Sequence, residues 1–269
     1  MRPITGAEMS VSKRLNWLQR LFGTAMGFAS FGIGGLLFAT TVVPWVWLTQ
    51  RHPATRAIRL RKAISRAFRL HVNMLRAFGV LDYRLHNGDR LENSRIVIAN
   101  HPTLLDVVFL VGFIENAVCV VKDSLFQTLF VGFVIRTAGY ISNADPHTMI
   151  DDCTKALDAN ASLVVFPEGT RSVPGTEARL QRGAAYIAMQ SGQPMTPVRI
   201  SCVPSSLTKA EKWYQIPPSM MQFDFVVDEP LNIAQHMDKP RALGGRSVNQ
   251  QIRRVLFKRP PMETQHVSA

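Results

Sequence analysis

The sequence predicts an α/β fold: a mixed, largely parallel sheet flanked by helices, with an N-terminal membrane-associated helical segment. Three observations predict it. From residue 81 onward, short β-rich runs alternate with stretches of helical periodicity. Residues 21–50 contain no charged side chain, and residues 51–80 carry eight Arg or Lys and no acidic residue. We therefore divide the chain into a membrane anchor with a basic amphipathic helix (1–80) and an α/β domain (81–269).

The composition narrows the class of protein. Of the 269 residues, 46% are hydrophobic and 19% charged, which excludes a disordered chain and a polytopic membrane protein. The net charge of +12 indicates an anionic partner, either nucleic acid or an anionic membrane surface. The three cysteines, Cys119, Cys153 and Cys202, form no CxxC pair. This argues against a zinc site or a disulfide framework and fits a reducing compartment.

The uncharged segment 21–50, LFGTAMGFASFGIGGLLFATTVVPWVWLTQ, is long enough to cross a bilayer once. A cleaved signal peptide has a shorter apolar region, of about 7–15 residues. Trp45 and Trp47 lie near one end, where indole rings favour the membrane interface. Two alternatives remain open: a buried core helix, and a shallow, re-entrant or kinked insertion around Pro44.

Residues 51–80 have the pattern of a basic amphipathic helix lying on phospholipid headgroups. At 100° per residue, the apolar face comprises Leu60, Ile64, Ala67, Phe68, His71, Leu75 and Phe78, and the opposite face Arg59, Lys62, Arg66, Arg69 and Arg76. The alternative is an ordinary helix packed on the domain. The flank after the uncharged segment is more basic than the flank before it, eight residues against four. This asymmetry places residues 81–269 on the cytoplasmic side. Because the densest basic block adjoins the membrane anchor, nucleic acid is the less favoured partner.

The α/β domain begins with a predicted hairpin over 81–100, with Asn87-Gly88 as a type I′ turn. Further strands are predicted at 95–99, 117–121, 139–142, 162–166, 196–200 and 223–227. Helices are predicted at 103–114, 124–137, 147–159 and 178–191, with one more basic helix at 246–260.

Polar residues follow the first buried strand in the stretch IVIANHPTLLDVVF. Pro102 disfavours helix at His101, so His101 ends the strand and a helix begins at about Thr103. Asp106 then lies on the first helical turn, where it can face His101. A carboxylate beside an imidazole fixes the ring tautomer and supports the imidazolium, which suits His101 as a general base. The alternative is structural, because Thr103 and Asp106 also have the spacing of a helix cap.

A second buried strand, SLVVF, also runs straight into polar residues. Pro167 and Gly169 shape the turn, and Glu168, Thr170 and Arg171 project from the strand's carboxyl end. Arg171 can grip a phosphate with two parallel hydrogen bonds. The alternative is a surface turn with a fortuitous arginine. In open α/β sheets ligands bind beyond the carboxyl ends of strands, so both clusters are expected to share one cleft.

HPTLLD and FPEGTRS resemble the His-x4-Asp and Phe-Pro-Glu-Gly-Thr-Arg motifs of the glycerolipid (lysophosphatidate-type) acyltransferases. Their order and their spacing, about 60 residues, are also similar. So are GYIS between the motifs and QRGAAYIA and MTPVRI after them. The uncharged segment followed by a basic helix is typical of the family's membrane attachment. The resemblance spans roughly residues 80–205 and implies that the α/β domain, 81–269, is an acyltransferase domain.

The resemblance implies a membrane-bound enzyme on the cytoplasmic face, at the inner membrane if the source is bacterial. It would move a fatty acyl group from acyl-CoA or acyl carrier protein to the hydroxyl of a lysophospholipid such as 1-acylglycerol 3-phosphate. His101 would be the general base, supported by Asp106. The residues implied for binding the acceptor headgroup are Glu168, Gly169, Thr170 and Arg171, together with Lys122, which could equally be an ordinary exposed lysine.

No cofactor or metal is implied. The sequence contains no G-x-S-x-G nucleophile motif, so the hydroxyl of the acceptor is the economical nucleophile. His101 and Asp106 alone are too few ligands for a zinc site. The expected partners are membrane phospholipid, the lysophospholipid acceptor and the acyl donor, and not nucleic acid.

One departure from the family pattern keeps other acceptors open. The family commonly has an arginine after its central strand, whereas this chain has Ser142, Asn143 and Ala144. This favours acceptors other than lysophosphatidate, such as a lyso-ornithine lipid or a specialised polyketide- or polyene-type lipid. Two further alternatives are a non-catalytic lipid-binding protein and a thioesterase-like hydrolase in which His101 activates water.

Overall fold

A seven-stranded sheet organises the computed structural model, which describes residues 11–173, 176, 178–209 and 211–257. Its strand order is β1-β7-β6-β2-β5-β3-β4, and every neighbouring pair is parallel except β6 with β7. The strands are β1 (Leu81–His86), β2 (Ile96–Ala99), β3 (Ala117–Val121), β4 (Ile141–Ser142), β5 (Ser162–Val165), β6 (Met195–Val203) and β7 (Met221–Val227). The predicted class, a mixed and largely parallel sheet flanked by helices, is confirmed.

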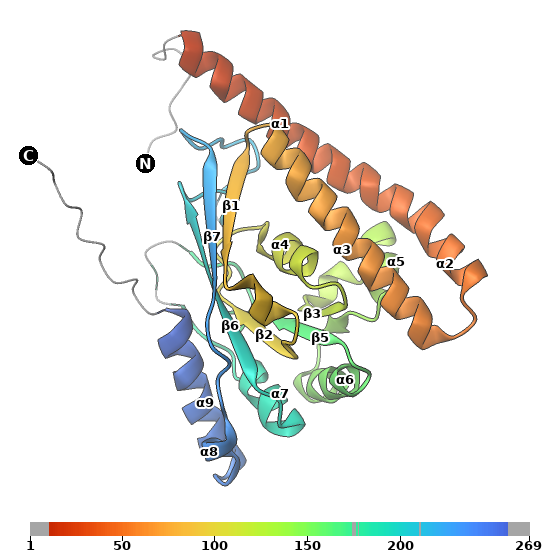
Figure 1. Ribbon diagram of the computed structural model, residues 1–269, viewed down its shortest axis with the longest axis vertical. Helices are drawn as coiled ribbons and strands as arrows, with labels where there is room; N and C mark the ends of the chain where they lie inside the picture. The colour runs from red at the N-terminus through yellow and green to blue at the C-terminus, as the bar shows by residue number, and fades with distance from the viewer. Residues whose placement is uncertain (1–10, 174–175, 177, 210, 258–269) are drawn as a thin grey trace, which may run out of the picture.

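Helices cover both faces of the sheet, as Figure 1 shows. The helices are α1 (Val11–Leu37), α2 (Val43–Thr49), α3 (Pro53–Ala77), α4 (Asp106–Phe113), α5 (Leu129–Thr137), α6 (Pro146–Asp158), α7 (Gly183–Ser191), α8 (Ala234–Met237) and α9 (Arg241–Leu256). One face packs against α3 and α4, and the other against α6, α7 and α9. The central strands are buried on both faces, which explains why IVIA and SLVV are continuous apolar runs.

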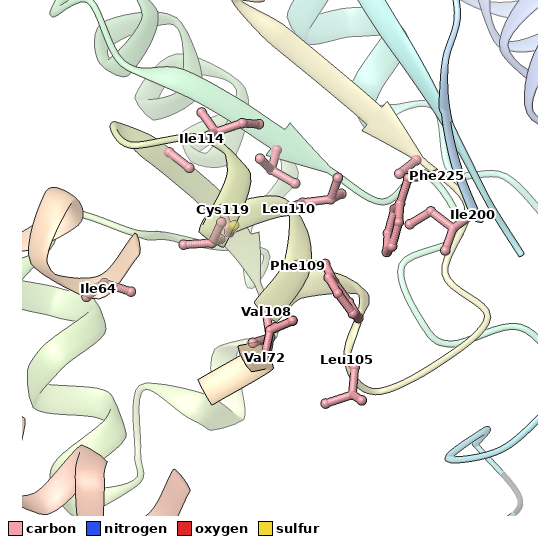
Figure 2. Close-up of a cluster of buried hydrophobic side chains, with 14 of the residues drawn as sticks. Ile64, Val72, Leu105, Val108, Phe109, Leu110, Ile114, Cys119, Ile200 and Phe225 are labelled. Atoms are coloured by element: carbon pink, nitrogen blue, oxygen red, sulfur yellow. The ribbon is translucent and has the colours of Figure 1, made fainter. Parts of the chain in front are cut away.

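The short helix α4 fills the space between the sheet and α3. Figure 2 shows its Phe109 beside Phe225 of β7, while Val108 lies by Val72 of α3. The Phe109 ring centroid is 4.8 Å from that of Phe225, and both side chains are almost completely buried. Because α4 carries Asp106 at its first position, this packing also holds the predicted site in place.

The predicted hairpin over 81–100 is wrong. β1 pairs in parallel with β7, and β2 pairs with β5 and β6. Asn87 does adopt the left-handed conformation expected of it, with φ of 56°, but Gly88 starts a 3-10 turn instead of a returning strand. The Asn87 side chain donates a hydrogen bond to the carbonyl of Val227, so a partner 140 residues away decides the course of the chain.

The predicted helix at 103–114 is real, but α4 begins only at Asp106. The region 124–137 is divided into a 3-10 turn, Asp123–Leu125, and α5. The predicted helices at 147–159 and 178–191 correspond to α6 and to a shorter α7. The C-terminal helix α9 begins earlier than predicted, and the end of the predicted range, 258–260, lies outside the described residues.

The N-terminal segment forms a helical hairpin in which α1 and α2 run alongside α3 (Figure 1). A π-helical turn, Phe38–Val42, joins α1 to α2. Two glycines of α1 allow a close approach to α3 and the residues after it: a Cβ at Gly27 would lie 2.6 Å from Leu75 Cδ2, and one at Gly23 would lie 2.6 Å from Val80 Cγ2. These two glycines therefore serve packing, whereas a Cβ at Gly32, Gly34 or Gly35 would meet open space.

The apolar face predicted for α3 does not lie free for contact with lipid. Leu60, Ile64 and Leu75 belong to the core cluster that α3 shares with α4 and the sheet, whereas Ala67 is exposed. The predicted arginine face is exposed, as expected. The division of the chain at residue 80 stays a prediction, although α3 shares the core of the α/β domain.

Candidate active site

A partly exposed His101 and a buried Asp106 form a pair at the carboxyl end of β2. His101 Nδ1 donates a hydrogen bond of 2.8 Å to Asp106 Oδ2, and the carboxylate has no exposed surface. Thr103 donates two more hydrogen bonds, from its backbone N–H to Oδ2 (2.7 Å) and from its hydroxyl to Oδ1 (2.6 Å). The capping geometry and the His–Asp pair are therefore present together.

The hydrogen bond to Asp106 sets the tautomer of His101. Burial raises the pKa of Asp106, while the hydrogen bonds from His101 and Thr103 counteract this rise. With Nδ1–H held by the carboxylate, a neutral His101 ring carries its lone pair on Nε2. Nε2 makes no hydrogen bond within the described part of the chain. The pair is thus arranged to accept a proton from a ligand.

The position of His101 is fixed by a contact of its ring and by the hydrogen bonds of the residue before it. It stacks on Phe166 with ring centroids 4.3 Å apart and an interplanar angle of 28°. The preceding residue, Asn100, extends the sheet through its side chain: its amide donates to the Ile200 carbonyl (2.8 Å), and its side-chain oxygen accepts from the Ile200 N–H (2.7 Å). His101 therefore leaves the sheet at a position that β6 determines.

The two motifs lie side by side, as their strands predict. β2 and β5 are parallel neighbours, so HPTLLD and FPEGTRS meet at one edge of the sheet. The Ser172 N–H donates to the His101 carbonyl (2.7 Å). Glu168 accepts from the His101 N–H (2.9 Å) and from the Ser172 hydroxyl (2.8 Å).

Glu168 is engaged by hydrogen bonds within the protein, and its predicted contact with an acceptor headgroup stays a prediction. The residue is 7% exposed, and each of its carboxylate oxygens already accepts a hydrogen bond from the protein. The Glu168 carboxylate acts as a clasp, in that its hydrogen bonds link the two motif loops. The sequence reasoning missed this because both Glu168 partners, His101 N–H and Ser172, come together only in the fold.

The rest of the second motif forms an open turn. Gly169 has φ of 67°, a conformation that favours glycine, and Thr170 is exposed. Arg171 is half-buried, and its Nη1 donates to the carbonyls of Leu207 (2.9 Å) and Thr208 (3.0 Å). Its Nε and Nη2 donate no hydrogen bond to any described residue. Two nitrogens of the guanidinium, Nε and Nη2, thus remain free to donate to an anionic ligand.

Lys122 lies farther along the same edge. It is exposed at the end of β3, and β5 separates β3 from β2 in the sheet. No hydrogen bond or ion pair joins Lys122 to the other predicted site residues in the described structure. The position where the family pattern has an arginine is occupied by a local network, in which Ser142 donates to Asp123 (2.8 Å) and Asn143 accepts from the Asp123 N–H (3.1 Å).

The environment of the cysteines disfavours a thiolate nucleophile. Burial raises the pKa of Cys119, Cys153 and Cys202 to about 12. Within the described ranges, no group of three or more His, Cys, Asp or Glu side chains could hold a metal ion.

Comparison with known proteins agrees with the motifs. Residues 82–201 match the family model described as Acyltransferase. Over 121 residues the chain is 27% identical to 1-acyl-sn-glycerol-3-phosphate acyltransferase BAT2, chloroplastic, of Brassica napus, which covers 43% of this chain and 35% of that protein. It is 26% identical over 152 residues to human 1-acyl-sn-glycerol-3-phosphate acyltransferase beta, and this match covers 53% of the chain and 55% of the human protein. The matched segments thus span about a third to a half of these relatives.

The fold is also found among solved structures. The crystal structure of the 1-acyl-sn-glycerophosphate (LPA) acyltransferase, PlsC, from Thermotoga maritima superposes with a TM-score of 0.66 at 18% identity. The similarity covers 91% of this chain and all of that one. It therefore includes helices outside the segment that the family model matches.

Proposed function

From the match of residues 82–201 to the acyltransferase family, we propose that the chain is a membrane-attached O-acyltransferase of the 1-acylglycerol-3-phosphate type. The observation that carries the proposal is the His101–Asp106 pair, with Nδ1 bound and Nε2 open, beside an arginine with free donors. A lysophospholipid would be the acceptor, and acyl-CoA or acyl carrier protein would be the acyl donor.

In the proposed reaction His101 Nε2 takes the proton of the acceptor hydroxyl, and the hydroxyl oxygen attacks the thioester carbonyl carbon. The carbon–sulfur bond breaks, an ester bond forms, and the leaving thiolate takes the proton from His101. Asp106 stabilises the imidazolium formed in between. A direct attack by the acceptor agrees with the raised pKa of all three thiols, which disfavours a cysteine nucleophile.

Arg171 is the group proposed to bind the acceptor phosphate, because a guanidinium offers paired donors to phosphate oxygens. Lys122 and the turn at Gly169 and Thr170 would border the same site. Ser142, in place of the family's arginine, removes one positive charge from this region. That departure favours the second candidate, an acyltransferase for an acceptor lipid without a phosphate.

An assay with defined acceptors tests both candidates. We expect the purified full chain, in detergent or vesicles, to convert 1-acylglycerol 3-phosphate and acyl-CoA or acyl carrier protein to phosphatidate. Acylation of lyso-ornithine lipid with no product from 1-acylglycerol 3-phosphate would select the second candidate instead. Release of fatty acid at an equal rate without any acceptor would identify a hydrolase and contradict both candidates.

Membrane attachment through α1 and α2 is part of the proposal. Residues Arg14–Thr49 form one helical segment with mean hydropathy 1.7 over its most apolar window, and much of its apolar surface is exposed, including Trp45 and Trp47. A passage across the bilayer would carry the exposed arginines of the adjoining α3 into hydrocarbon. We therefore favour the shallow insertion into one leaflet, with the domain on the cytoplasmic side.

A second element extends this apolar surface. α5 contacts α1 and exposes Leu129, Phe130, Val131 and Phe133. Leu129 is 77% exposed, an unusual position for a large apolar residue in the absence of a partner. We expect α5 to contact the same leaflet as α1 and α2.

Vesicle binding tests this arrangement. Replacing Leu129 and Phe130 together by glutamate is expected to weaken partition onto phosphatidylglycerol-containing vesicles by about tenfold or more, because two apolar side chains no longer enter the interface. Leu243→Glu is the matched control, since Leu243 is 54% exposed on α9, which covers the opposite face of the sheet. Equal losses in both variants would contradict the assignment of α5.

A further inference from the structure

The segment between β6 and β7 contacts both motifs of the candidate site. Of its described residues, 204–209 and 211–220, we call 204–209 and 211–218 the bridging segment. The Leu207 carbonyl accepts hydrogen bonds from the N–H of Leu104 (3.1 Å) and from Arg171 Nη1 (2.9 Å). Leu104 lies between His101 and Asp106 in the chain. One carbonyl oxygen therefore joins the first motif to the second.

Leu207 holds this carbonyl in an unusual backbone conformation. Its φ is 56°, in the left-handed region, which costs free energy for a residue with a branched apolar side chain. The side chain is 7% exposed and belongs to the core. Such strain persists only where the surrounding structure imposes it, and it is often found at functional sites. The surroundings of the bridging segment thus determine where the carbonyl points.

The other side of the bridging segment is packed against α1. Arg20 is 4% exposed, and its Nη2 donates to the Pro218 carbonyl (3.1 Å). The rings of Phe28 and Trp213 have centroids 5.9 Å apart. Arg20 and Leu207 line the same cavity of about 10 Å³, close to the space of a single water molecule. α1 and the bridging segment therefore fit closely.

Arg20 is buried at this contact, and removing a guanidinium from water costs free energy. Its Nη1 has no hydrogen-bond partner among the described residues and no exposure to solvent. Arg14 on the same helix is exposed, whereas Arg20 is buried, and a buried guanidinium needs hydrogen-bond partners within the protein. By donating to the Pro218 carbonyl, Arg20 fixes the position of this end of the bridging segment.

We propose that Arg20 is a positioning residue for acceptor binding, acting through the bridging segment on Arg171. With α1 packed on the domain, Arg20 donates to the Pro218 carbonyl and lines the cavity that Leu207 also lines. The carbonyls of Leu207 and Thr208 in turn orient the guanidinium of Arg171. Asp106 is held by Thr103 and His101 directly, and the bridging segment reaches this loop only through the Leu104 N–H, so the larger effect is expected on Arg171. The inference rests on the proposed function, in which Arg171 binds the acceptor.

Steady-state kinetics of Arg20→Met in the full chain test the inference. Loss of a hydrogen bond from a charged group is expected to raise KM for the acceptor about tenfold, with kcat changed less than about threefold. Arg171→Lys raises the same KM, and the double variant shows no further increase, because both act on one interaction. Multiplied effects in the double variant, or a fall in kcat alone, would overturn the inference.

Gln19→Ala is the matched control. Gln19 neighbours Arg20 and also donates from α1 to a backbone carbonyl, but to that of Phe78, outside the bridging segment (3.3 Å). We expect its KM for the acceptor to equal that of the wild type. A rise in KM equal to that of Arg20→Met would show that any loosening of α1 suffices, which contradicts a specific role for Arg20.

Amide hydrogen exchange provides a readout independent of activity. The Leu104 N–H, which donates to Leu207, is expected to exchange about tenfold faster in Arg20→Met, while Val97 in β2 stays unchanged. If Arg20→Met does not fold, Trp213→Ala breaks the other contact with α1 and is read in the same way. An unchanged Leu104 rate in a folded variant overturns the inference. A wild type that acylates no lysolipid overturns the proposed function instead.

Discussion

Replacing His101 by alanine is expected to reduce acyl transfer by about 10²–10⁴-fold, the contribution of a well-placed general base. His101 Nδ1 is held by Asp106 at 2.8 Å, and the ring stacks on Phe166, so Nε2 is presented in a single orientation. Without it, nothing in the pair can take the proton of the acceptor hydroxyl. The measurement is the initial rate of acylated lipid formation at saturating donor and acceptor.

His101→Gln accompanies this variant, because it keeps a polar side chain of similar size and separates lost chemistry from lost packing. His147→Ala is the control, since His147 is exposed at the start of α6. We expect it to retain full activity. A folded His101→Ala protein that transfers acyl groups at the wild-type rate would remove His101 as the base.

Asp106→Asn is expected to lower kcat by about 10²–10⁴-fold and to lower the free energy of unfolding by about 1–3 kcal/mol. The carboxylate accepts hydrogen bonds from His101 and from both donors of Thr103, and it has no exposed surface. An amide has only one oxygen to accept these bonds, so a buried donor loses its partner. The imidazolium of His101 also loses its countercharge. Kinetics and chemical denaturation measure the two effects separately.

The matched control for Asp106 is Asp145→Asn. Asp145 also accepts hydrogen bonds from the N–H and the hydroxyl of a threonine, Thr148, both at 2.7 Å, but it caps α6 in an exposed position. We expect this variant to keep its activity. An Asp106→Asn protein with normal kcat and reduced stability would assign Asp106 to the helix cap alone.

Much of the site could be predicted because its parts are local. His101, Thr103 and Asp106 lie within one turn of chain, so the residue before a proline and the capping spacing already place their side chains together. The apolar runs before His101 and Pro167 identified two buried strands, and parallel strands end at the same edge of a sheet. The shared edge of the two motifs followed from these two facts.

Other features depended on partners far away in the sequence. Asn87-Gly88 has the composition of a hairpin turn, yet β1 gains more by pairing with β7, 140 residues later. Glu168 reads as a ligand-binding carboxylate, yet its partners are the His101 backbone and Ser172. Burial of the α3 apolar face against α4, in place of lipid, depends likewise on a helix about 40 residues further on.

The sequence by itself determined the α/β class, the two motif loops and the His–Asp pair, because these depend on hydrophobic periodicity and on contacts within a few residues. Only the tertiary structure decided that Glu168 is a clasp, that α1 lies along the domain, and that the Leu207 carbonyl joins Leu104 to Arg171. Each of these requires a buried polar group to find a partner across the fold. That partner is set by how the layers pack, and no local pattern in the sequence encodes it.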